Sequence, residues 1–149
     1  MENTNKKQIV VVASGYFDPI HIGHIEYLKL AKKLGDKLIV IVNNDEQCKL
    51  KKGFAFMPEA ERVAIVKALR CVDEVVLSID KEKIGIHVPV SNTLEMIKPN
   101  IFAKGGDRFA GEIPESETCR RNNIAIVDGL GKKIQASSSL IANYEKQNK

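Results

Sequence analysis

Two histidines that flank a glycine are the residues of this sequence whose types and spacing most directly suggest chemistry. They end the segment Gly15-Tyr16-Phe17-Asp18-Pro19-Ile20-His21-Ile22-Gly23-His24, which follows a short β-branched run and precedes a helical pattern. At this spacing His21 and His24 would share one face of the first turn of a helix. A helix N-terminus offers free N–H groups and partial positive charge to an anion, and imidazoles beside it can donate hydrogen bonds to phosphate oxygens. We therefore interpret the segment as an anion-binding site, the alternative being helix-capping or core histidines.

The elements that would position this loop alternate between apolar runs and helical patterns. Strands are expected at Ile9–Ala13, Leu38–Val42, Val72–Leu77, Ile101–Ala103 and Ile124–Val127. Helices are expected at Ile22–Leu34, Pro58–Arg70, Ser91–Ile97, Pro114–Arg121 and Ser137–Glu145. This order predicts one α/β, Rossmann-like domain over residues 1–149, with its core at about 8–145 and a parallel five-stranded sheet covered by helices on both faces.

Ligands of such sheets bind at the carboxyl ends of the strands, near the point where the strand order reverses. The loops after Ala13, Val42, Ala103 and Val127 are therefore the expected site. Residues 81–90 fit no single element, and a loop, an extra strand and a dimer contact all remain open for them.

The composition excludes several classes of protein. No apolar run approaches the ~18 residues that a membrane span needs, and the polar N-terminal segment has no signal-peptide pattern. The net charge of +4 is too small to indicate a nucleic-acid partner by itself. Three widely spaced cysteines argue against a disulfide scaffold or a zinc site, so we expect a cytoplasmic location.

The histidine loop resembles the G-x-F-D-x-x-H-x-G-H signature of the cytidylyltransferase-like nucleotidyltransferases. The likeness covers roughly residues 9 to 142 and continues in Asn43-Asn44-Asp45, Glu61-Arg62, Val72-Asp73-Glu74-Val75, Lys104-Gly105-Gly106-Asp107 and Ser137-Ser138-Ser139. The fourth of these segments is similar to the K-G-G-D turn of heptose-1-phosphate adenylyltransferases and the G-D-D turn of glycerol-3-phosphate cytidylyltransferases.

The resemblance implies transfer of a nucleotidyl group, CMP or AMP, from CTP or ATP to a phosphorylated small molecule, with release of pyrophosphate. The acceptor would be a sugar phosphate, a polyol phosphate or a head-group phosphate. Such catalysis is mainly positioning and electrostatic stabilisation, without a covalent enzyme intermediate. The resemblance also implies Mg²⁺ held through the substrate phosphates rather than by a protein metal site, and a homodimer.

The resemblance assigns three groups of residues. The catalytic group is His21, His24 and Lys132, with Lys133 as the alternative to Lys132. The nucleotide- and phosphate-binding group is Gly15, Tyr16, Phe17, Gly23, Lys104, Gly105, Gly106, Asp107, Ser137, Ser138 and Ser139. The acceptor-binding group is Asp18, Lys52 and Arg62, with Lys51 or Lys49 as neighbours of Lys52. Asp18 has the alternative of orienting the loop, and Arg62 that of a helix-surface ion-pair partner.

Other functions remain open. One alternative is a coenzyme-pathway adenylyltransferase acting on phosphopantetheine, nicotinamide mononucleotide or flavin mononucleotide (FMN), although the R-G-x-R segment of phosphopantetheine enzymes is absent. Another is a nucleotide-binding module without turnover, against which the complete set of site residues argues. Class I aminoacyl-tRNA synthetases also carry an H-I-G-H segment, but this chain has no K-M-S-K-S segment. Tyr16, Phe54 and Lys132 depart from the family pattern of a small residue, a second lysine and an arginine.

Overall fold

A single parallel sheet organises the chain, whose computed structural model describes residues 7–85, 87–105 and 113–130. Its strands are β1 (Val10–Gly15), β2 (Lys37–Val42), β3 (Glu74–Leu77), β4 (Ile101–Gly105) and β5 (Ala125–Leu130). They lie in the order β3-β2-β1-β4-β5, every neighbouring pair being parallel. The order reverses between β1 and β4, which places the expected ligand crevice at the carboxyl ends of those two strands.

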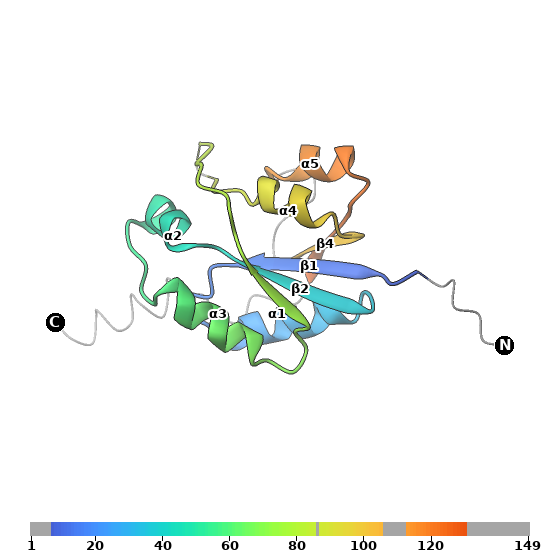
Figure 1. Cartoon of the computed structure of the whole chain (residues 1–149), viewed down its shortest axis with the longest axis horizontal. Helices are drawn as coiled ribbons and strands as arrows, with labels where there is room; N and C mark the ends of the chain where they lie inside the picture. The colour runs from blue at the N-terminus through green and yellow to red at the C-terminus, as the bar shows by residue number, and fades with distance from the viewer. Residues whose placement is uncertain (1–6, 86, 106–112, 131–149) are drawn as a thin grey trace.

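Helices cover both faces of the sheet, as Figure 1 shows. The helices are α1 (Ile22–Lys32), α2 (Asp45–Lys52), α3 (Glu59–Lys67), α4 (Ser91–Ile97) and α5 (Ser116–Arg121). Successive strand residues point to opposite faces. Val11 accordingly packs in one core cluster with Leu28 of α1 and Val66 of α3, whereas Val12 packs with Leu94 of α4 in the other. The predicted Rossmann-like fold is confirmed.

Helix α2 was not among the expected elements. Its sequence is rich in lysine and has no apolar stripe, and the residues it buries are Gln47 and Cys48. Its ends are nevertheless well formed, because the Asn44 side chain accepts a hydrogen bond from the Gln47 amide at 2.8 Å and Gly53 ends the helix at φ +86°. Helix α2 thus follows β2 directly and brings its lysines to the carboxyl edge of the sheet.

Residues 81–85 and 87–90 belong to a loop that contains a tight turn. Ile84 and His87 exchange backbone hydrogen bonds of 2.7 and 2.9 Å, and Gly85 takes a positive φ of +62° between them. In the part of the chain that the structure describes, no helix is both long and apolar enough to cross a membrane. The expected helix Ser137–Glu145 lies outside the described residues.

Candidate active site

The two histidines form a stacked pair at the start of α1. His21 is the N-cap residue, and its Nδ1 accepts a hydrogen bond from the Gly23 amide at 3.1 Å. The Nδ1 of His24 accepts from the His21 amide, also at 3.1 Å, and the two ring centroids lie 3.9 Å apart. The capping alternative is therefore real for both histidines. It does not exclude anion binding, because it occupies only one nitrogen of each ring.

The capping hydrogen bonds decide which ring nitrogen carries the proton. A nitrogen that accepts a backbone N–H is unprotonated, so each neutral imidazole carries its hydrogen on Nε2. Burial lowers the pKa of His21, and burial together with the neighbouring His21 lowers the pKa of His24 to about 3. Both rings are therefore neutral near pH 7 and have one N–H donor each to offer a phosphate oxygen.

Asp18 and Lys52 hold the histidine loop in place. Asp18 is fully buried, and its carboxylate accepts hydrogen bonds from the backbone amides of Phe56 and Met57. The Lys52 Nζ lies 2.8 Å from the Asp18 carboxylate and 2.8 Å from its carbonyl oxygen. Burial alone would raise the pKa of Asp18, but these hydrogen bonds outweigh it and hold the pKa below its usual value. Asp18 thus joins the loop after β1 to the last residue of α2 and to the segment that follows it.

Arg62 is a buried side chain that joins three segments of the site, namely the loop after β1, the turn between β2 and α2, and the segment after α2. Its side chain is 1% exposed, and Nε donates to the Met57 carbonyl at 2.9 Å. Its Nη1 donates to the carbonyls of Tyr16 and Asn43, and Nη2 lies 2.7 Å from the Asp45 carboxylate. Arg62 does form an ion pair, but beneath the surface of α3 rather than on it. These contacts hold the three segments together, and the acceptor contact that the family resemblance implies for Arg62 stays a prediction.

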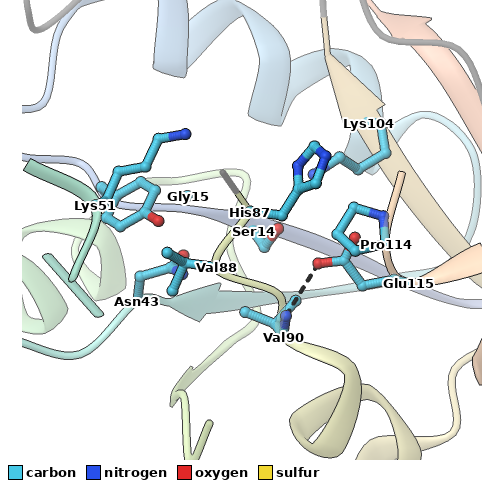
Figure 2. Close-up of a pocket in the computed structure, with 11 residues that line it drawn as sticks. Ser14, Gly15, Asn43, Lys51, His87, Val88, Val90, Lys104, Pro114 and Glu115 are labelled. Atoms are coloured by element: carbon cyan, nitrogen blue, oxygen red, sulfur yellow. Dashed lines mark hydrogen bonds between the residues drawn. The ribbon is translucent and has the colours of Figure 1, made fainter. Parts of the chain in front are cut away.

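A cavity of about 180 Å³ opens at the carboxyl ends of β1, β2 and β4 (Figure 2). Its wall is formed by Ser14, Gly15, Tyr16, Asn43, Lys51, His87, Val88, Val90, Lys104, Pro114 and Glu115. Gly15, Tyr16 and Lys104 are among the predicted nucleotide-site residues, whereas Lys51 lines the cavity in the place expected for Lys52. The cavity lies at the expected reversal of strand order, and His87 and Glu115 are wall residues that the sequence patterns did not indicate.

The amide of Asn43 faces the cavity in an orientation set by residues behind it. The Gln47 Nε2 donates to the Pro89 carbonyl at 2.9 Å, so the Gln47 Oε1 must face the other way. That oxygen accepts from the Ser78 hydroxyl and from the Asn43 Nδ2, the latter at 3.0 Å. Asn43 lines the cavity and is 4% exposed, and with its Nδ2 engaged by Gln47 its Oδ1 is left as an acceptor.

Tyr27 links the carboxyl ends of β1 and β4 next to the site. Its hydroxyl accepts from the Ser14 amide at 3.2 Å and donates to the Ala103 carbonyl at 2.5 Å. Burial raises the pKa of this phenol, so it stays protonated and keeps the second hydrogen bond. A Cβ at Gly105 would lie 3.2 Å from the Tyr27 ring, which explains a glycine at the end of β4. In the sequence Tyr27 is one residue of an amphipathic helix. Only its hydroxyl group distinguishes it from an apolar core residue and indicates a hydrogen-bonding role.

The predicted residues therefore divide into five sets. His21, Gly23, His24 and Phe17, whose ring lies 4.8 Å from that of His24, surround the start of α1, and Gly105 ends β4 beside Tyr27. Gly15, Tyr16 and Lys104 line the cavity, and Asp18, Lys52 and Arg62 are tied to other loops. Gly106, Asp107, Lys132, Ser137, Ser138 and Ser139 lie outside the described residues.

Comparisons with known proteins agree on the family. The family model described as cytidylyltransferase-like matches residues 12–143. The chain is 40% identical over 103 residues to an FAD synthase of Pyrococcus abyssi, which is 68% of this chain and 66% of that protein. It is 36% identical over 135 residues to the bifunctional protein HldE of Geotalea uraniireducens, which is 86% of this chain but 26% of that one.

A solved structure extends the likeness to the fold. The lipopolysaccharide core biosynthesis protein from Thermoplasma volcanium superposes with a TM-score of 0.67 at 32% identity, covering 85% of this chain and 98% of that one. The family match covers nearly the whole sheet, the histidine pair and the cavity wall described above. The chain belongs to the cytidylyltransferase-like family of nucleotidyltransferases.

Proposed function

We propose that this protein is an adenylyltransferase that transfers AMP from ATP to the phosphate of FMN, giving FAD and pyrophosphate. The observation that carries the transfer chemistry is the pair of neutral imidazoles at the start of α1, each with its Nδ1 occupied and its Nε2–H available. The choice of ATP and FMN rests on the similarity to the Pyrococcus abyssi FAD synthase. It takes up the coenzyme-pathway alternative in place of the sugar, polyol or head-group acceptor expected first.

The reaction needs positioned donors more than it needs an acid or a base. An oxygen of the FMN phosphate attacks the α-phosphorus of ATP, and the bond from that phosphorus to the bridging oxygen breaks with its electron pair leaving on pyrophosphate. The Nε2–H groups of His21 and His24 would donate to the phosphate oxygens on which charge grows, at the positive end of the α1 helix dipole. Lys132 and Ser137–Ser139 remain predicted to hold the leaving phosphates.

We assign the cavity to the acceptor. Its wall carries the cations Lys51 and Lys104 within one pocket that also holds Tyr16, so an anionic phosphate and a planar ring both find partners. Lys51 is the better candidate for the acceptor phosphate because it lines the cavity. Lys52 does not line the cavity and contacts both the carboxylate and the carbonyl of Asp18. In this proposal Asp18, Lys52 and Arg62 position the loop rather than touch substrate.

Mg²⁺ fits this proposal as a companion of the nucleotide. The side chains at the start of α1 are nitrogen donors, and Mg²⁺ prefers oxygen ligands. The oxygens of Asp18 are taken by amides and by Lys52. We therefore propose that triphosphate oxygens and water hold the ion, which would neutralise part of the phosphate charge.

A sugar phosphate is the second candidate acceptor. The similarity to HldE and to the lipopolysaccharide core biosynthesis protein supports it. The polar atoms on the cavity wall, among them the Asn43 amide and the Glu115 carboxylate, also suit a hydroxyl-rich ligand. Both candidates share the same transfer chemistry and differ only in the body of the acceptor.

The test is a turnover assay with ATP or CTP, Mg²⁺ and either FMN or a panel of sugar 1-phosphates. We expect FAD and pyrophosphate from ATP with FMN, measured by chromatography with fluorescence detection. Turnover of a sugar phosphate but not of FMN would select the second candidate. Absence of a nucleotidyl product with every pair would refute the proposed activity.

His24→Asn is the matched variant for the transfer chemistry. An asparagine oxygen can still accept from the His21 amide, so the cap is retained while the Nε2–H is lost. We expect kcat to fall at least a hundredfold, or about 2.7 kcal/mol, as for the loss of one oxyanion donor. A variant within tenfold of the parent would contradict the role given to His24.

A further inference from the structure

Glu115 is a buried carboxylate that has more hydrogen-bonding capacity than the protein uses. It precedes α5, is 4% exposed, and one of its oxygens accepts from the Val90 amide at 2.9 Å. Figure 2 shows this hydrogen bond at the edge of the cavity. Within the described ranges, no ion pair or hydrogen bond reaches its second oxygen.

That second oxygen is not fully enclosed by the protein. No fully buried side-chain nitrogen or oxygen of the described residues lacks a partner, so an oxygen without a partner here is one that solvent or a ligand can reach. Glu115 lines the cavity, and the cavity is the space available beside it. A desolvated carboxylate without a partner costs free energy, which a ligand that donates a hydrogen bond would recover.

Asn43 presents a second acceptor to the same space. The Pro89 carbonyl fixes Gln47, and Gln47 in turn fixes the Asn43 amide with its nitrogen turned away. Asn43 and Glu115 both line the cavity, and the Asn43 Oδ1 and the second Glu115 oxygen are atoms that can only accept. The cations Lys51 and Lys104 stand on the same wall and suit an anionic end of the ligand.

We propose that Glu115, with Asn43, is a specificity-determining residue that selects acceptors whose body carries hydrogen-bond donors. This inference rests on the proposed function, because it takes the cavity to be the acceptor site. Hydroxyl groups and a ring imide N–H are donors of this kind, and FMN and sugar phosphates both carry one or the other. A phosphate ester with an apolar body would cover both oxygens without pairing them and is rejected.

Glu115→Gln is the sharpest test. Its amide oxygen can keep the hydrogen bond from the Val90 amide, while its NH₂ group turns the cavity-facing atom from an acceptor into a donor. Glu117→Gln is the control, since Glu117 lies in the first turn of α5, two residues after Glu115, with a side chain that is 61% exposed and paired with Arg120 on the surface. Binding is measured by calorimetry without ATP, using FMN, glucose 1-phosphate and phenyl phosphate, and the Tm of each variant is recorded.

We expect the parent to bind FMN or glucose 1-phosphate at least tenfold tighter than phenyl phosphate. Glu115→Gln should weaken the preferred probe at least tenfold, leave phenyl phosphate within twofold and leave Tm within a few degrees, while Glu117→Gln changes none of these. The probe whose affinity falls in Glu115→Gln identifies the kind of acceptor body that Glu115 contacts.

Two outcomes would overturn the assignment. One is equal binding of all three probes, or of none, by the parent, which does not depend on any variant folding. The other is a folded Glu115→Gln variant whose affinities stay within twofold of the parent. Turnover of ATP by the parent is scored separately, so its absence counts against the proposed function and not against the role of Glu115.

Discussion

Replacing Arg62 by methionine should lower the free energy of unfolding of the protein rather than its affinity for the acceptor. Methionine keeps the stem but removes the donors to the carbonyls of Met57, Tyr16 and Asn43. A buried acceptor that loses its partner costs about 1–3 kcal/mol, and breaking a buried ionic contact about 3–5 kcal/mol. The Asp45 end is partly exposed, so we expect a total loss of ~3–5 kcal/mol in the free energy of unfolding.

For a chain of 149 residues, each kcal/mol shifts Tm by about 3 °C, so Tm should fall by roughly 10–15 °C. Thermal unfolding followed by circular dichroism measures it. Arg120→Met is the matched control: Arg120 is 74% exposed and pairs with Glu117 across one turn, so its Tm should stay within about 2 °C of the parent. If Arg62→Met keeps Tm within 3 °C and raises only the KM of the acceptor, Arg62 is an acceptor-binding residue and our reasoning is wrong.

Two further predictions concern charge. Burial holds the pKa of His24 near 3 in the native chain, whereas the unfolded chain has the ordinary value of about 6.5. As pH falls below about 6.5, His24 is therefore protonated in the unfolded chain but not in the native chain. The free energy of unfolding, from urea titrations, should therefore decline between pH 6.5 and 4.5, and less steeply for His24→Asn; equal slopes would contradict the depressed pKa. Lys51→Ala should raise the KM of the acceptor with little change in Tm, whereas Lys52→Ala should lower Tm by leaving the Asp18 carboxylate buried without its cation. The reverse pattern in kinetics and thermal unfolding would restore the acceptor role to Lys52.

The fold was largely predictable because its strands are continuous apolar runs. A strand buried on both faces, such as β2 from Lys37 to Val42, carries its signal in a few adjacent residues. Helix α2 was missed because it buries polar side chains, so its sequence lacks the apolar period by which helices are recognised. Its capping residues, Asn44 before two acidic residues and Gly53 after a basic turn, were the available signal.

The histidine pair was predictable because its geometry is local. His21 and His24 lie within one helical turn, so their spacing alone places them together. Arg62 was harder to place because its partners Tyr16 and Asn43 are 46 and 19 positions away in the chain. For Glu115, only the packing of α5 against the Val90 loop reveals which of its oxygens is used. Sequence patterns thus identify residues by type and spacing, while long-range contacts decide what each one does.

The orientation of the Asn43 amide has a consequence for anyone who wishes to redesign the acceptor preference. Because Gln47 sets that orientation and the Pro89 carbonyl sets Gln47, the polarity of one cavity atom is encoded by groups that no ligand would touch. Replacing wall residues alone would leave this control in place. A library that varies Gln47 and Ser78 together with Asn43 would give cavity walls of a polarity that substitution of the lining residues alone cannot give. The most productive positions for redesign are therefore the residues that contact the cavity wall from behind.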